Sequence, residues 1–138
     1  MRILFVHCNY PAQFRHLSQH LAANKDNEIV FLCQNKEWTA TNVPELKLSR
    51  YQLGRDPKGN LCHPYLRRYE TAVLHGQAAL REALRLRQDG FEPDLIIGHS
   101  GFGNTIYLKE VWPKAKFIGY FEWFYRSRGA DVGFGSNQ

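Results

Sequence analysis

The feature that constrains the fold most is the segment from Asp94 to Asn104, which reads DLIIGHSGFGN. An apolar run that ends in Gly and His and passes into a Gly-rich turn is typical of a buried strand followed by a tight loop. Open parallel α/β sheets place their ligand sites in the crevice outside the carboxyl ends of such strands. We therefore expect His99 and the residues after it to face a crevice.

The N-terminus of the chain repeats this pattern. The apolar run from Arg2 to His7 gives way to the sequence CNYP at positions 8–11, where a strand must stop. Because parallel strands end at the same edge of a sheet, the two strand ends predict one shared rim.

Strand and helix patterns alternate along the chain. Helices are predicted at about 12–23, at 64–88 with a stop at Gly90 before Pro93, and at about 104–111. Further strands are predicted at 28–33, 46–51, 95–97 and 116–121. The order strand, helix, strand favours parallel pairing through a right-handed crossover. The expected fold class is therefore α/β, a Rossmann-like three-layer domain with a mostly parallel sheet.

The long helix at 64–88 carries apolar residues at helical spacing. They predict its buried stripe, which comprises Leu66, Tyr69, Val73, Leu80 and Leu84. Gly76 lies on the same side, where it is expected to let the helix approach the sheet. The arginines of this helix are interpreted as a solvated face, with contact to anionic lipid or phosphate as the alternative; they are Arg67, Arg68, Arg81, Arg85 and Arg87.

The size and charge of the chain limit the classes of protein. A chain of 138 residues, 43% of them hydrophobic, is long enough for one compact domain. The net charge of +5 is interpreted as a contribution to solubility, and no nucleic acid partner is expected. No segment resembles a signal peptide, and no run approaches the ~20 apolar residues that span a bilayer. The expected location is the cytoplasm, with peripheral attachment at the inner face of the membrane left open.

The three cysteines, Cys8, Cys33 and Cys62, form an odd set without C-x-x-C spacing. Neither a disulfide framework nor a zinc site is indicated by this pattern. We expect buried free thiols and a reducing compartment.

Two catalytic motifs can be compared with the residues present. A G-x-S-x-G nucleophile elbow around Ser100 would need Gly at position 102, where Phe stands, and no His follows His99 to complete a hydrolase triad. Hydrolysis through Ser100 is therefore kept only as a rival hypothesis. The dinucleotide fingerprint G-x-G-x-x-G is missing after the first strand, so NAD binding has little support.

Several other residues are candidates for a binding site. His99 could bond a ligand or act as a base near neutral pH, and its place at a strand end favours this over a purely structural role. Gly101 and Gly103, expected just before a helix, would either bring backbone N–H groups close to an anion or form a tight turn. The sequence FEWFYR at 121–126 is suited to gripping a sugar ring, or else belongs to an interface left uncovered.

Taken together, six segments resemble the N-terminal domain of a bacterial branch of the family 4 glycosyltransferases, and they extend over nearly the whole chain. They are MRILFVH at 1–7, PAQFRHL at 11–17, HPY at 63–65, DLIIGHSGFG at 94–103, KEVWP at 109–113 and GYFEWFY at 119–125. The resemblance implies a GT-B architecture, in which two Rossmann-like domains face each other across a cleft. Such enzymes move a sugar from a nucleotide-sugar donor to an acceptor with retention of anomeric configuration.

The resemblance also implies a domain organisation. Residues 1–138 would form the acceptor-side N-terminal domain, and a C-terminal domain that holds most of the donor site would be absent from this chain. The isolated chain is then expected to be inactive. No metal or cofactor is implied beyond the nucleoside diphosphate sugar that serves as donor substrate. The expected partners are an acceptor glycan or lipid-linked sugar and the missing C-terminal domain, with a homodimer through an exposed aromatic surface left open.

The resemblance carries over one site residue, and the other contacts are predicted from their place around the cleft. His99 matches the histidine that related enzymes place after the fourth strand, facing the transferred sugar, and is the predicted catalytic residue. Substrate contacts are predicted for Asn9, Ser100, Gly101, Gly103 and Glu122. Many relatives carry a Gly pair in the first loop that approaches the donor phosphates, whereas this chain has Asn9, Tyr10 and Pro11. A non-catalytic binding or assembly module with the same fold is the alternative from another class.

Overall fold

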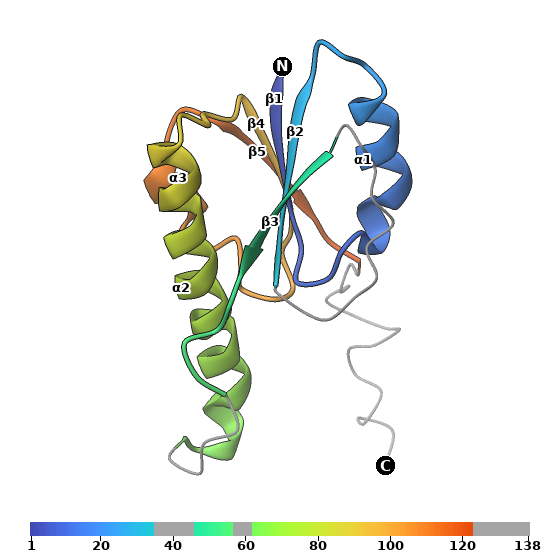
Figure 1. The fold of residues 1–138 in the computed structure, drawn as a ribbon. Coiled ribbons are helices and arrows are strands. Elements are labelled where there is room, and N and C mark those ends of the chain that lie inside the picture. The colour runs from blue at the N-terminus through green and yellow to red at the C-terminus, as the bar shows by residue number, and fades with distance from the viewer. Residues whose placement is uncertain (35–45, 57–61, 123–138) are drawn as a thin grey trace, which may run out of the picture.

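A computed structural model of the chain describes residues 1–34, 46–56 and 62–122. The described residues form a five-stranded sheet with helices on both faces (Figure 1). The strands are β1 (Arg2–Val6), β2 (Glu28–Gln34), β3 (Leu46–Tyr51), β4 (Leu95–His99) and β5 (Lys116–Tyr120). They lie in the order β3-β2-β1-β4-β5, and every neighbouring pair is parallel. The predicted α/β class with a Rossmann-like parallel sheet is confirmed.

Strand β1 lies at the centre of the sheet, between β2 and β4. Val6 is opposite Leu32 of β2 on one side and Gly98 of β4 on the other. After β3 the chain crosses back over the sheet, so that β4 is added on the other side of β1. The order of the strands therefore reverses between β1 and β4. In open α/β sheets, the crevice for a ligand lies at such a reversal, outside the carboxyl ends of the strands.

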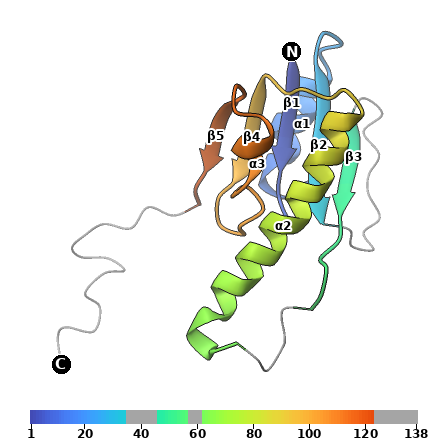
Figure 2. The same cartoon turned by 90° about the vertical axis from the view of Figure 1, so that its left-hand side faces the viewer.

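Helices cover the two faces of the sheet (Figures 1 and 2). A short 3₁₀ helix, η1 (Ala12–Phe14), leads into α1 (Arg15–Ala22) on one face. The other face carries η2 (Pro64–Leu66), α2 (Arg67–Gln88) and α3 (Leu108–Val111). The N-terminal half of α2 projects beyond the end of the sheet (Figure 2). In the described part of the chain, no helix combines the length and the apolar character needed to cross a membrane.

The C-terminus of α2 ends as predicted. Gly90 has a φ of +86°, the left-handed conformation that glycine adopts without strain. The N–H of Phe91 donates to the carbonyl of Leu86 at 2.9 Å, and the N–H of Gly90 donates to that of Arg87 at 3.0 Å. These two bonds form a Schellman motif, which satisfies carbonyls that the helix end would leave unpaired.

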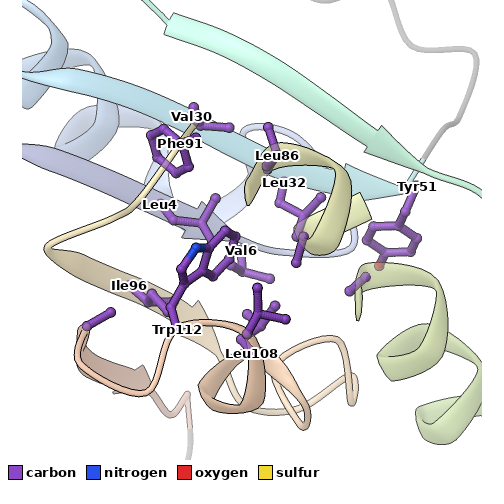
Figure 3. Packing of buried hydrophobic residues seen from close by; sticks show 14 of the residues in the cluster. Leu4, Val6, Val30, Leu32, Tyr51, Leu86, Phe91, Ile96, Leu108 and Trp112 are labelled. Atoms are coloured by element: carbon purple, nitrogen blue, oxygen red, sulfur yellow. The ribbon is translucent and has the colours of Figure 1, made fainter. Parts of the chain in front are cut away.

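The core has two parts, one on each face of the sheet. Successive side chains of a strand point to opposite faces, so Leu4 and Val6 of β1 face α2 while Ile3 and Phe5 face α1. On the α2 side they pack with Leu86 and with other buried residues that include Val30, Leu32, Ile96, Leu108 and Trp112 (Figure 3). Burying each side chain of this kind contributes about 1.5–3 kcal/mol to the stability of the folded state.

The buried face of α2 differs from the predicted stripe. Of the predicted residues, Leu66, Tyr69, Val73 and Leu84 are exposed. The buried face instead consists of mostly small residues, which are Leu74, His75, Gly76, Ala78, Ala79, Ala83 and Leu86. Small side chains let the helix lie close to the sheet, whereas the larger Leu66, at the end of η2, and Tyr69, in the first turn of α2, precede the buried part of the helix. A Cβ on Gly76 would lie 2.9 Å from the carbonyl oxygen of Gly103. This glycine therefore lets the loop after β4 approach α2, and not the sheet as predicted.

Two predicted elements have different limits or surroundings. The third helix begins at Leu108 rather than near residue 104, because residues 104–107 form turns after the left-handed Gly103. Strand β5 forms where a strand is predicted, but most of its side chains are exposed. It forms one edge of the described sheet, and Phe121 just after it is 74% exposed.

Candidate functional site

Two histidines meet where β1 and β4 end. His7 follows β1 directly, and His99 is the last residue of β4. Their ring centroids are 4.9 Å apart at an interplanar angle of 83°, and both residues are almost fully buried. The predicted shared rim is therefore confirmed. The sequence predicted His99 as a site residue but not His7, although His7 stands in the same position at the end of a strand.

The ring of His99 is held in one orientation by the loop that follows it. The backbone N–H of Gly101 donates to Nδ1 at 3.0 Å. A backbone N–H can only donate, so Nδ1 carries no proton and the proton of the neutral ring is on Nε2. Phe102 stacks on the ring with centroids 4.7 Å apart. A Cβ on Gly101 would lie 2.8 Å from Cε1 of His99, which explains why glycine stands there.

The other ring nitrogen of His99 faces a carboxylate. Nε2 lies 3.5 Å from Oε2 of Glu122 and makes no hydrogen bond with any described residue. The second oxygen of Glu122 accepts from the side-chain amide of Gln13. The sequence predicted Glu122 as a substrate contact but missed Gln13, because no local pattern relates residues 109 positions apart. The structure thus brings Glu122 to His99, with an acceptor oxygen beside a ring N–H.

His7 is held by the first loop. Its Nδ1 lies 2.8 Å from the amide nitrogen and 2.9 Å from the carbonyl oxygen of Asn9. Phe102 and Phe14 pack edge-on against the ring, at centroid distances of 5.1 and 6.1 Å. Asn9, a predicted substrate contact, is half-buried at this rim. Its backbone positions His7, and a role for its side chain stays a prediction.

Ser100 connects the ends of two strands. Its hydroxyl donates to the carbonyl of Tyr120 at 2.9 Å, and its backbone N–H donates to the same oxygen at 3.1 Å. His99 does not take part in this contact, because its Nδ1 is bonded to Gly101. A serine nucleophile needs an adjacent base, so this geometry does not support the rival hypothesis of a hydrolase.

Gly103 has a packing role in the same loop. Its φ is +84°, and a Cβ there would lie 2.3 Å from the carbonyl oxygen of Ala72 in α2. The anion site considered for Gly101 and Gly103 depended on a helix beginning directly after them. The four-residue α3 begins only at Leu108, so this element does not support that interpretation. Substrate contacts of the two glycines stay a prediction.

Other predicted groups are placed as follows. No disulfide forms among the described residues: Cys8 and Cys33 are buried, and Cys62 is partly exposed. Burial raises the pKa of Cys33 to about 11. Within residues 1–34, 46–56 and 62–122, no three His, Cys, Asp or Glu side chains are grouped so that they could hold a metal ion. Of the segment FEWFYR at 121–126, residues 123–126 lie outside the described ones.

Comparison with known protein families finds a match. The family model of the glycosyl transferase family 4 group matches residues 25–138. No curated protein and no solved structure matches the chain significantly. The matched span includes β4, His99 and Glu122, whereas His7, Asn9 and Gln13 precede it. Because this span covers most of the chain and agrees with the parallel sheet, the chain belongs to the glycosyl transferase family 4 group.

Proposed function

We propose that this chain is the acceptor-side domain of a retaining glycosyltransferase. The enzyme moves a hexosyl group from a nucleoside diphosphate sugar to a hydroxyl of an acceptor glycan or lipid-linked sugar. Membership of the family supports sugar transfer as the reaction class. A second α/β domain supplies the nucleotide site in this proposal, and a lipid-linked acceptor would bring the protein to the membrane surface.

The observation that carries the proposal is the state of Nε2 of His99. This nitrogen is buried and makes no hydrogen bond with a described residue. An unsatisfied buried donor costs about 1–3 kcal/mol, and an oxygen of a bound sugar would remove that penalty. Since the neutral ring carries its proton on Nε2, His99 donates to the ligand and does not accept from it. Its role is to orient the transferred sugar and to stabilise charge that develops on its oxygens.

Glu122 complements this donor. A sugar hydroxyl both donates and accepts hydrogen bonds. Nε2 of His99 and Oε2 of Glu122 are 3.5 Å apart, so one hydroxyl oxygen can lie within bonding distance of both. Gln13 restrains the carboxylate through its other oxygen. Asn9 is proposed as a further contact on the β1 side of the same rim.

The test uses the complete gene product and a panel of nucleoside diphosphate sugars. His99→Ala should lower turnover at least ~100-fold, while the matched control His16→Ala, at an exposed histidine of α1, should leave it unchanged. Near-normal turnover by His99→Ala would remove His99 from the mechanism. If the unaltered gene product turns over no nucleotide sugar, the proposed function is wrong and the non-catalytic binding module takes its place.

A further inference from the structure

A second concave surface lies beside the rim, between α2 and the loop that follows β4. It is a pocket of about 400 Å³. The first turns of α2 line one side with Arg67, Arg68 and Thr71, and the loop lines the other with Gly101 and Phe102. None of the contacts described for the rim uses the two arginines.

The two arginines give this pocket a positive charge. Among the described residues, neither Arg67 nor Arg68 forms an ion pair with a carboxylate, unlike Arg85, which pairs with Glu82. Glu70 is the acidic residue nearest to them along α2, and its carboxylate is paired with Arg55. A guanidinium presents N–H donors in a planar fork that matches the oxygens of a phosphate or carboxylate. The pocket therefore has the chemistry to bind an anionic group.

The pocket and the rim share one wall. Phe102 lines the pocket and also stacks on the ring of His99, with centroids 4.7 Å apart. The lining also includes His75, which is 9% exposed and whose Nδ1 lies 2.9 Å from the hydroxyl of Tyr51. A ligand with its anionic group at the arginines would pass Phe102 to reach His99. Aromatic side chains suit this position, because sugars pack their apolar faces on such rings.

We propose that this pocket receives an anionic group of the acceptor, a phosphate or a carboxylate, and so selects acceptors that are charged. This inference rests on the proposed function, which assigns the donor nucleotide to a second domain. An anion held on the present domain then belongs to the acceptor. The arginines hold the charged end, and the neighbouring hydroxyl is presented to the rim.

Binding to the chain can be measured by titration with NMR detection at constant ionic strength. The probes are glucose 1-phosphate, glucuronate, neutral glucose and uridine diphosphate. We expect a charged sugar to shift the amide signals of Gly101 and Phe102 and to bind at least ~10-fold more tightly than glucose. Arg67→Gln and Arg68→Gln should each weaken that binding by about 10-fold, as expected for a charge-assisted contact.

Arg81→Gln is the matched control. Arg81 is exposed on the same helix, about 20 Å from Arg68 at 1.5 Å per residue. The proposal is wrong if charged sugars bind no better than glucose, if Arg81→Gln weakens binding as much as Arg68→Gln, or if only uridine diphosphate binds. The last result would assign the pocket to the donor.

Turnover by the complete gene product separates this inference from the proposed function. If His99→Ala abolishes turnover but Arg67→Gln and Arg68→Gln leave the KM of the acceptor unchanged, the proposed function stands and the pocket proposal fails. If charged sugars bind in an arginine-dependent way but no nucleotide sugar is turned over, the pocket binds anions and its assignment to an acceptor fails together with the proposed function.

Discussion

Replacing Gly103 with Ala should strongly destabilise the domain. The structure allows the loss of stability to be divided into two terms. The first term is backbone strain, because the φ of +84° is a left-handed conformation. For a residue with a Cβ this costs about 1–2 kcal/mol. The second term is steric, because the new Cβ would lie 2.3 Å from the carbonyl oxygen and 2.5 Å from Cα of Ala72. Moving the loop away from α2 should add about 1–3 kcal/mol.

Gly90→Ala is the control that isolates the steric term. Gly90 has nearly the same φ, +86°, but an added Cβ would have no neighbour within 4 Å. Gly90→Ala should therefore lose only about 1–2 kcal/mol. The difference between the two variants measures how closely α2 and the loop pack.

The free energy of unfolding can be measured by urea titration monitored by far-UV circular dichroism. We expect the free energy of unfolding of Gly103→Ala to be about 1–3 kcal/mol lower than that of Gly90→Ala. This difference is a large part of the 5–15 kcal/mol that typically stabilises a domain. Equal losses in the two variants would refute the close contact between Gly103 and Ala72. They would instead favour the alternative in which glycine is needed at position 103 for the approach of a ligand and not for packing against α2.

Two further predictions concern the loop and the thiols. Gly101→Ala would place a Cβ 2.8 Å from Cε1 of His99 and should displace the ring. If the complete gene product transfers sugar as proposed, its turnover should fall about 10–100-fold, with little change in Tm. Unchanged turnover would show that the position of the His99 ring does not matter. At pH 8 a disulfide reagent such as 5,5′-dithiobis(2-nitrobenzoate) should rapidly label only the thiol of Cys62 in the folded chain, because Cys8 and Cys33 are buried. In denaturant it should label all three thiols. Rapid labelling of two or three thiols in the folded chain would contradict the burial of Cys8 and Cys33.

The central strands and the shared rim could be predicted because their signals are local. A strand buried on both faces of a parallel sheet needs a continuous apolar run, and β1 and β4 each have one. The polar residue at the end of such a run must lie at the carboxyl edge of the sheet. Knowing only that β1 and β4 are parallel neighbours is then enough to bring His7 and His99 together.

The buried face of α2 could not be predicted in the same way. Alanines carry little hydrophobic signal, yet Ala79 and Ala83 are completely buried because they let the helix approach the sheet. Tyr69 carries a strong signal but is 73% exposed, because it lies on the part of α2 that projects beyond the sheet. The point along a helix at which it stops contacting the sheet depends on how elements distant in the sequence are aligned with it. For the same reason, no local pattern relates Gln13 to Glu122.

The loop after β4 shows how one motif can have several physical meanings. In the sequence, Gly101 and Gly103 could serve an anion or a tight turn, and in the structure each makes room for a different neighbour. Gly101 leaves space for the ring of His99, and Gly103 leaves space for α2. Phe102 between them covers the ring. The helix thus fixes the loop, and the loop fixes the proton of His99 on Nε2. Gly103→Ala should therefore act first on stability and Gly101→Ala first on turnover, although only one residue separates them.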